Sequence, residues 1–296
     1  MAAPSRYLDP AVLARLGTLD LKAKTVVEGV LTGLHRSPRR GFSVEFAEYR
    51  QYLPGDALTT IDWKVYARTD RHVVKKFEED TSLDCHLLLD VSASMQFGSR
   101  GLSKGEYGCM LAASLAYLMH RQRDAVGLIA FDDAIVHRVP PSARAGHLRA
   151  LLLALERLPA GHRTNVAKPL ADLAKVLSKR GLVVVISDLL DDPARVIEGL
   201  RHFRQRGTDV IVFHLLDEQE LQFTFADVAR FRDTESATEV FVDPAQVRGD
   251  YLRAMQGFID TYRRELGGAG IDYHLLDTSK PLDLALLAYL TMRGRS

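Results

Sequence analysis

The sequence predicts a doubly wound, mostly parallel α/β sheet that follows an N-terminal helical and β-hairpin unit. Four short apolar runs succeed one another along the chain, and segments of helical periodicity separate them. The runs are continuous rather than alternating, and they occupy residues 87–89, 126–131, 183–186 and 210–216. Strands buried on both faces of a parallel sheet require such runs, and regular alternation of strand and helix indicates the doubly wound arrangement.

The chain begins with two predicted helices and a strand-like segment. Asp9 as cap, Pro10 at the first position and Gly17 as stop predict the first helix, and a second helix follows over about residues 20–34. After a basic, turn-rich patch, residues 42–78 are strand-like and aromatic, with a turn at 54–56. A helical and β-hairpin unit is therefore expected before the sheet.

The later elements complete the sheet. Ser103 and Glu106 form a capping box that begins a helix. That helix has an apolar face made of Tyr107, Met110, Leu111, Leu115 and Leu118. Residues 223–242 are expected to form an inserted hairpin. A helix over 248–266, a strand over 271–276 and a helix after Pro281 close the domain.

The bulk composition excludes several classes of protein. A chain of 296 residues with 47% hydrophobic composition can bury a sizeable core. With 39 basic and 38 acidic residues, it has no general attraction to nucleic acid or to an anionic membrane. Its two cysteines, Cys85 and Cys109, sit in apolar runs at no metal-ligand spacing, which indicates reduced, buried thiols. There is no signal-peptide core and no apolar stretch near the ~18 residues that span a bilayer, so we expect a cytoplasmic protein with no membrane span.

Polar side chains follow the apolar runs at the points where strands should end. In open α/β sheets, ligands bind beyond the carboxyl ends of the strands. An Asp-x-Ser-x-Ser sequence follows the first run, an aspartate follows the third, and a threonine lies in a loop between them. These residues are Asp90, Ser92, Ser94, Thr164 and Asp188. Two carboxylates and three hydroxyls are therefore expected to converge on one edge of the sheet.

The chemistry of this set favours a divalent cation. Two carboxylates about 6 Å apart repel by roughly 3 kcal/mol at an effective dielectric near 20, and a cation removes that repulsion. All five groups offer oxygen, which selects Mg²⁺ first, with Mn²⁺ or Ca²⁺ as alternatives, over zinc. Two carboxylates only just neutralise such an ion, so an open position should still favour an anionic ligand, such as a carboxylate of another protein. We predict a non-enzymatic protein-binding site.

At these residues the chain resembles the metal-ion-dependent adhesion site of von Willebrand factor A domains. In that family an Asp-x-Ser-x-Ser loop, a threonine on a second loop and an aspartate on a third bind the ion together. The resemblance implies this role for Asp90, Ser92, Ser94, Thr164 and Asp188. It makes residues 81–296 a von Willebrand factor A-like domain and residues 1–80 the N-terminal unit.

A second resemblance covers the preceding region and identifies a narrower family. Its motifs are Glu45-Phe46, Tyr49-Arg50, Tyr52, Pro54-Gly55-Asp56, Ile61-Asp62-Trp63, Ala67-Arg68-Thr69 and Lys75-x-Phe77-Glu78-Glu79. They are similar to the signature of the bacterial "domain of unknown function 58" family. That family is commonly associated with MoxR-type AAA+ ATPases, which implies an adaptor or co-chaperone role.

Two other functions stay open on the sequence. A haloacid-dehalogenase-like phosphotransferase could use Asp90 as nucleophile, with Thr164, Lys175 and either Asp188 or Asp192. Against it, Ser92 stands where such phosphatases have a second aspartate, and serine cannot act as a general acid at neutral pH. The other alternative is a scaffold that binds no metal, for which Asp90→Ala would leave partner binding intact.

Overall fold

A computed structural model divides the chain into two compact units, Met1–Thr32 with Leu83–Ser296, and Gly33–Ser82. The residues that the structure describes are 10, 13, 17–36, 49–51, 73–75, 84–159, 161, 165–177, 181–225, 229–232 and 239–293. The division differs from the predicted boundary between residues 80 and 81, because α2 (Leu19–Arg36) begins within the larger unit. There the Leu19 amide donates a hydrogen bond to Glu156 Oε1 at 3.1 Å.

A six-stranded sheet organises the larger unit, in the order β10-β7-β6-β3-β4-β5. The strands are β3 (Asp84–Asp90), β4 (Ala125–Phe131), β5 (Ile135–Ser142), β6 (Gly181–Ser187), β7 (Asp209–Leu216) and β10 (Asp272–Asp277). All neighbours pair in parallel except β4 and β5, which are antiparallel. The predicted fold class, a doubly wound and mostly parallel α/β sheet, is confirmed.

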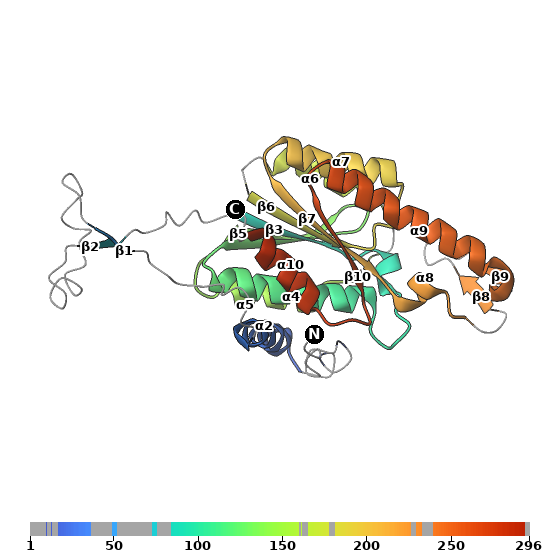
Figure 1. The fold of residues 1–296 in the computed structure, drawn as a ribbon, viewed down its shortest axis with the longest axis horizontal. Helices are drawn as coiled ribbons and strands as arrows, with labels where there is room; N and C mark the ends of the chain where they lie inside the picture. Colours follow the sequence, from blue (N-terminus) through green and yellow to red (C-terminus); the bar gives the residue numbers. More distant parts are fainter. Residues whose placement is uncertain are drawn as a thin grey trace. The chain divides into compact units, whose positions relative to one another are not determined.

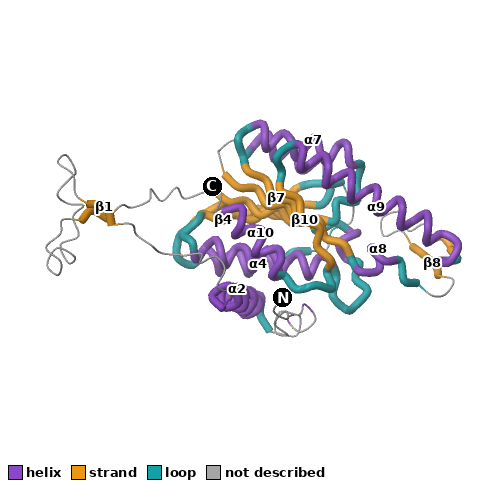
Figure 2. Tube along the Cα trace, viewed as in Figure 1, coloured by secondary structure: helices purple, strands orange, loops and turns teal. Residues whose placement is uncertain are grey.

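Helices cover both faces of this sheet (Figures 1 and 2). They are α4 (Lys104–Arg121), α5 (His147–Glu156), α6 (Ala167–Val176), α7 (Pro193–Gln205), α9 (Pro244–Gly268) and α10 (Asp283–Arg293). The short α8 (Glu218–Gln222) follows β7 and buries no residue. Leu88 is fully buried in the core shared with α6, α7 and α9. Its neighbour Leu89 points the other way, so that a β-carbon at Gly108 of α4 would lie 3.0 Å from it. The continuous apolar run of β3 is therefore explained by burial on both sides.

Most predicted elements lie where the sequence placed them. The four apolar runs are β3, β4, β6 and β7, and the late helix, strand and helix are α9, β10 and α10. The inserted hairpin is β8 (Ala229–Arg232) paired antiparallel with β9 (Glu239–Val242). In the smaller unit, β1 (Tyr49–Gln51) pairs antiparallel with β2 (Val73–Lys75). The first predicted helix lies largely outside the described residues.

Strand β5 was not predicted. It is the antiparallel edge strand, mostly exposed, and it contains Pro140 and Pro141. Proline cannot donate to a ladder and is confined to edges, so such a strand lacks the apolar run that identifies the buried strands. Among the helices of the described residues, none combines the length and apolar character needed to cross a lipid bilayer.

The predicted capping box at the start of α4 is confirmed. Ser103 Oγ accepts a hydrogen bond from the Glu106 amide at 3.1 Å, and Glu106 Oε2 accepts one from the Ser103 amide at 2.8 Å. A Ser103→Ala variant should lose about 1 kcal/mol of unfolding free energy, because one amide of the first helical turn loses its acceptor. Chemical denaturation measures this loss. Thr291→Ala, which removes an exposed hydroxyl of α10 that donates to the Leu287 carbonyl, serves as the control, and an equal loss in both variants would contradict the assignment.

Candidate functional site

The candidate site lies where the order of strands reverses. β3 neighbours both β4, the next strand along the chain, and β6, which comes after β5. In doubly wound sheets, ligands bind at such a point, beyond the carboxyl ends of the strands. Asp90 ends β3 and Ser187 ends β6, so the two loops that follow these strands face the same crevice.

Asp90 organises the first of these loops. Its Oδ1 accepts a hydrogen bond from the Ser92 amide at 2.9 Å, and its Oδ2 accepts one from Ser187 Oγ at 2.5 Å. The hydroxyls of Ser92 and Ser94 lie 3.1 Å apart. The Asp-x-Ser-x-Ser segment is thus curled back on its own carboxylate, with two hydroxyl oxygens beside it.

Burial changes the acid–base behaviour of Asp90. The side chain has no exposed surface, and burial together with the nearby Asp188 carboxylate raises the pKa of Asp90 to about 7. The hydrogen bonds from Ser187 and Ser92 act in the opposite direction and lower it. An ionised Asp90 is therefore electrostatically unfavourable here, and a cation beside it would stabilise the charged form.

The second loop holds an unusual backbone conformation directly after Asp188. Leu189 has φ 53°, in the left-handed region that a branched, bulky residue rarely adopts. Its amide donates to Ser187 Oγ at 2.9 Å, and its carbonyl accepts from the Tyr262 hydroxyl at 3.1 Å. Residues held in such conformations cluster at functional sites. Two hydrogen bonds therefore hold this conformation directly beside Asp188.

A buried lysine that the sequence did not indicate contacts Asp188. Lys104 is the first residue of α4, and its side chain has no exposed surface. Its Nζ lies 2.8 Å from Asp188 Oδ2 and 2.6 Å from Glu220 Oε1. Burial lowers the pKa of Lys104, but these two carboxylates outweigh burial and raise it. Burial raises the pKa of Glu220, although Lys104 lowers it in part.

The structure brings together four of the five predicted site residues: Asp90, Ser92, Ser94 and Asp188. The fifth, Thr164, lies outside the described residues. Within the part of the chain that the structure describes, no three His, Cys, Asp or Glu side chains converge as a metal-binding group. A cation here would therefore rely on the serine hydroxyls beside the two aspartates. This oxygen-only set fits a hard divalent ion on the Asp90 side, whereas Asp188 is shared with Lys104.

Two of the residues that a phosphotransferase could use, Lys175 and Asp192, lie elsewhere, whereas Asp188, the alternative to Asp192, lies at the site. Lys175 Nζ is bonded to Asp172 at 3.1 Å on the exposed surface of α6. Asp192 caps α7 by accepting from the Ala194 amide at 3.0 Å. Asp191 accepts from the Ala167 amide at 3.1 Å and so ties this loop to the start of α6.

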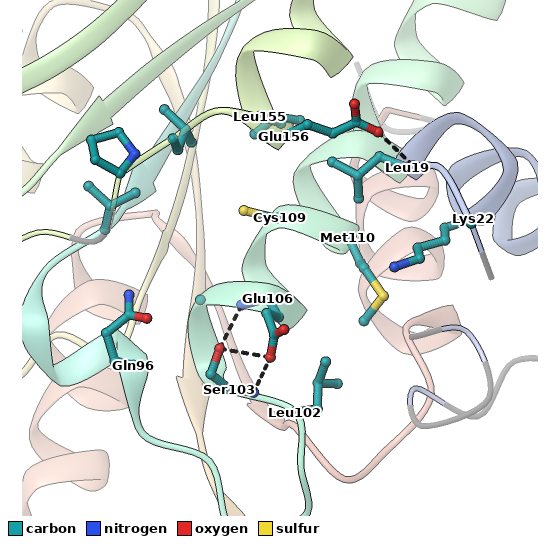
Figure 3. A pocket seen from close by; sticks show the side chains of 15 residues that line it. Leu19, Lys22, Gln96, Leu102, Ser103, Glu106, Cys109, Met110, Leu155 and Glu156 are labelled. Carbon is teal, nitrogen blue, oxygen red and sulfur yellow. Dashed lines mark hydrogen bonds between the residues drawn. The ribbon is translucent and has the colours of Figure 1, made fainter. Parts of the chain in front are cut away.

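Two hollows flank the site. The first, of about 500 Å³, lies between α2, α4 and the end of α5, behind the Asp90–Ser94 loop (Figure 3). Cys109 lines it and is half-buried rather than buried as predicted, and burial raises the pKa of its thiol to about 11. This thiol is therefore protonated at neutral pH and poorly reactive.

The second hollow is strongly apolar. It has a volume of about 470 Å³, and half of the residues that line it are aromatic, namely Phe97, Phe223, Phe225, Phe231 and Tyr251. Glu220, a partner of Lys104, also lines it. Phe97 lies 5.9 Å from Lys104 Nζ, measured to the ring centroid. An aromatic surface therefore adjoins the charged site directly.

Two histidines, His214 and His86, lie on strands of the sheet. His214 is fully buried, its Nδ1 lies 2.7 Å from the Tyr273 hydroxyl, and burial lowers its pKa to about 4. It is a core residue, although its buried Nε2 has no hydrogen-bond partner among the described residues. His86 is half-buried on β3, and burial also lowers its pKa.

Comparisons with known proteins place the chain among relatives of undetermined function. A family model described as "Protein of unknown function DUF58" matches residues 48–257. The uncharacterized protein Rv1480 of Mycobacterium tuberculosis is 30% identical over 292 residues, which are 97% of this chain and 91% of that protein. The uncharacterized protein Mb1516 of Mycobacterium bovis matches to the same extent.

Solved structures with a similar arrangement are more distant. Protein BatB from Bacteroides thetaiotaomicron is 15% identical, with a TM-score of 0.48, and the match covers 72% of this chain and 100% of that chain. The VWA domain of SpRpn10 is 13% identical, with a TM-score of 0.36, and the match covers 69% and 93%. These low identities and scores assign no role to any residue of the present site.

Proposed function

The chain belongs to the DUF58 family of proteins of unknown function, and we propose that it is a protein-binding module that holds one divalent cation at the Asp90–Ser94 loop. The cation, Mg²⁺ in the first instance, binds a carboxylate of the partner at its open position. The observation that carries this proposal is the fully buried Asp90 carboxylate at the strand-order reversal, beside two hydroxyls and a second aspartate.

The charge count supports an anionic partner group. Glu220 balances the charge of Lys104, so Asp90 and Asp188 remain to match the two charges of the ion. The serine hydroxyls add oxygen ligands and no charge. An open coordination position would therefore still attract a carboxylate, and the adjoining aromatic hollow offers contact area to apolar side chains of the same partner.

The resemblance described above extends the proposal to the identity of the partner. By that resemblance the partner is a MoxR-type AAA+ ATPase, and this chain acts as its adaptor or co-chaperone without catalysing a reaction itself. The rival phosphotransferase was expected to use Lys175, which pairs with Asp172 on the exposed surface of α6.

Calorimetric titration of Mg²⁺ and Mn²⁺ into chelator-treated protein tests the ion site. We expect saturable binding of one ion per chain, and a loss of affinity of at least about 100-fold in Asp90→Ala, because a charged ligand is removed. Asp172→Ala, which removes an exposed carboxylate on α6, is the matched control and should bind like the wild type. The purified ATPase should lose affinity for Asp90→Ala in parallel.

Two results would favour the alternatives. If the wild type binds no ion and Asp90→Ala keeps its affinity for the partner, the chain is a metal-free scaffold. If the loaded protein hydrolyses a phosphate monoester such as p-nitrophenyl phosphate and Asp90→Ala does not, the phosphotransferase reading replaces the present one.

A further inference from the structure

Lys104 occupies a position that its own helix disfavours. It is the first residue of α4, where the helix dipole places partial positive charge and repels a cation. Nevertheless its side chain is fully buried, with Nζ between Asp188 Oδ2 at 2.8 Å and Glu220 Oε1 at 2.6 Å. The two carboxylates therefore hold this ammonium group in place, and it supplies a fixed positive charge inside the candidate ion site.

The two aspartates of the site differ in their partners. Both oxygens of Asp188 already have donors, since Leu190 donates its amide to Oδ1 at 3.2 Å and Lys104 contacts Oδ2. Asp90 accepts from an amide and a hydroxyl, and no described cationic side chain contacts it. For a divalent cation at Asp90, the negative charge of the nearby Asp188 is therefore already partly offset by Lys104.

We propose that Lys104 is a tethered counter-ion that competes with the divalent cation for Asp188 and thereby sets the affinity of the site for metal. The inference rests on the proposed function, because it presupposes an ion at the Asp90–Ser94 loop. Without the ion, the ammonium group stabilises the buried Asp188 charge. When the ion binds, it interacts with the Asp188 carboxylate in place of Lys104, and Lys104 keeps Glu220 as its remaining partner.

Because Lys104 also pairs with Glu220, the proposal predicts opposite changes in ion affinity when the lysine charge or the glutamate charge is removed. Removing the lysine charge frees Asp188 for the ion and should strengthen binding. Removing the Glu220 charge leaves Lys104 with Asp188 as its charged partner and should weaken binding. A purely structural role for the lysine would instead weaken binding in both variants, through loss of packing.

The test is a Mn²⁺ titration of the full chelator-treated chain, followed by calorimetry, for Lys104→Met, Glu220→Gln and the wild type. We expect Lys104→Met to bind Mn²⁺ at least tenfold more tightly, about 1.4 kcal/mol. Glu220→Gln should bind several-fold more weakly. Lys24→Met, which removes an exposed charge on α2, is the matched control and should leave the affinity unchanged.

Each outcome separates the two proposals. If the wild type binds Mn²⁺ and folded Lys104→Met binds it equally or more weakly, the counter-ion inference is overturned and the proposed function stands. If neither protein binds Mn²⁺, the ion site itself is overturned. Should Lys104→Met fail to fold, Lys104→Gln replaces it with the same expectation, because glutamine keeps a hydrogen-bond donor without the charge.

Discussion

The Asp90→Asn variant is expected to gain up to about 4 kcal/mol of unfolding free energy relative to the wild type as the pH rises from about 4 to 7, in the absence of divalent cations. The cause is the pKa of Asp90, which burial and the neighbouring Asp188 raise from 3.8 to about 7 in the folded protein. Asparagine keeps the shape of the side chain and has no charge to bury.

The sign follows from proton binding. Between the two pKa values the folded protein retains a proton on Asp90 that the unfolded chain has released. Wild-type stability therefore falls as the pH rises above about 4, and this contribution levels off once the pH passes about 7. Saturating Mg²⁺ should reduce the fall, because a bound cation favours the ionised carboxylate.

The difference between variants is the quantity to measure, because His214 acts in the opposite direction. Burial lowers its pKa to about 4, so its contribution to stability is present above about pH 6.5 and is lost as the pH falls toward 4. The two opposing effects overlap in the wild type. The His214 contribution is common to both proteins and cancels in the comparison with Asp90→Asn, which leaves the Asp90 contribution. Urea denaturation across this range gives the result, with exposed Asp172→Asn as control. If the unfolding free energies of Asp90→Asn and the wild type change in parallel with pH, the prediction is wrong.

The central strands of the sheet were predictable because a strand that is buried on both faces needs apolar residues at successive positions. The runs that became β3, β4, β6 and β7 are continuous apolar segments. Edge strand β5 was not predicted because most of its residues are exposed and two are prolines, so it has no continuous apolar segment. Signals from the sequence therefore identify the centre of this sheet better than its margin.

The candidate site was predictable to the extent that its residues follow strands. Asp90, Ser92, Ser94 and Asp188 could be found by reading what comes after each apolar run. The same rule, applied to the run that became β7, would have reached Glu220, four residues beyond its end.

Lys104 belongs to a helix start and follows no strand, so the same rule cannot find it. Its signal was subtler: a cation at the first position of a capped helix opposes the helix dipole, which suggests a nearby acidic partner. Lys104 and Asp188 are 84 positions apart in the sequence, and their contact becomes evident only when α4 is seen packed against the sheet.

The Gly161→Ala variant should lose about 1–3 kcal/mol of unfolding free energy and bind Mn²⁺ roughly tenfold more weakly. Gly161 donates its amide to the Val91 carbonyl at 2.7 Å, and the Val91 amide donates to Phe131 at 2.8 Å. Val91 lies between Asp90 and Ser92, so these two bonds fix the loop that carries the candidate ligands. A β-carbon at residue 161 would lie 2.5 Å from the Val91 carbonyl oxygen, and one of the two backbones would have to move.

Gly257→Ala is the matched control for this substitution, because it adds the same methyl group where nothing lies within 4 Å, on the exposed face of α9. That variant should gain about 0.5–1 kcal/mol, since alanine favours the helix over glycine. Thermal denaturation and Mn²⁺ titration of both variants separate a local displacement from a general effect of the added methyl. Weaker Mn²⁺ binding in Gly161→Ala alone would show that the ion depends on the geometry of the Asp90–Ser94 loop. Unchanged binding in that variant would mean that the loop accommodates the methyl group without moving the ligands, and the predicted loss of Mn²⁺ affinity would be wrong.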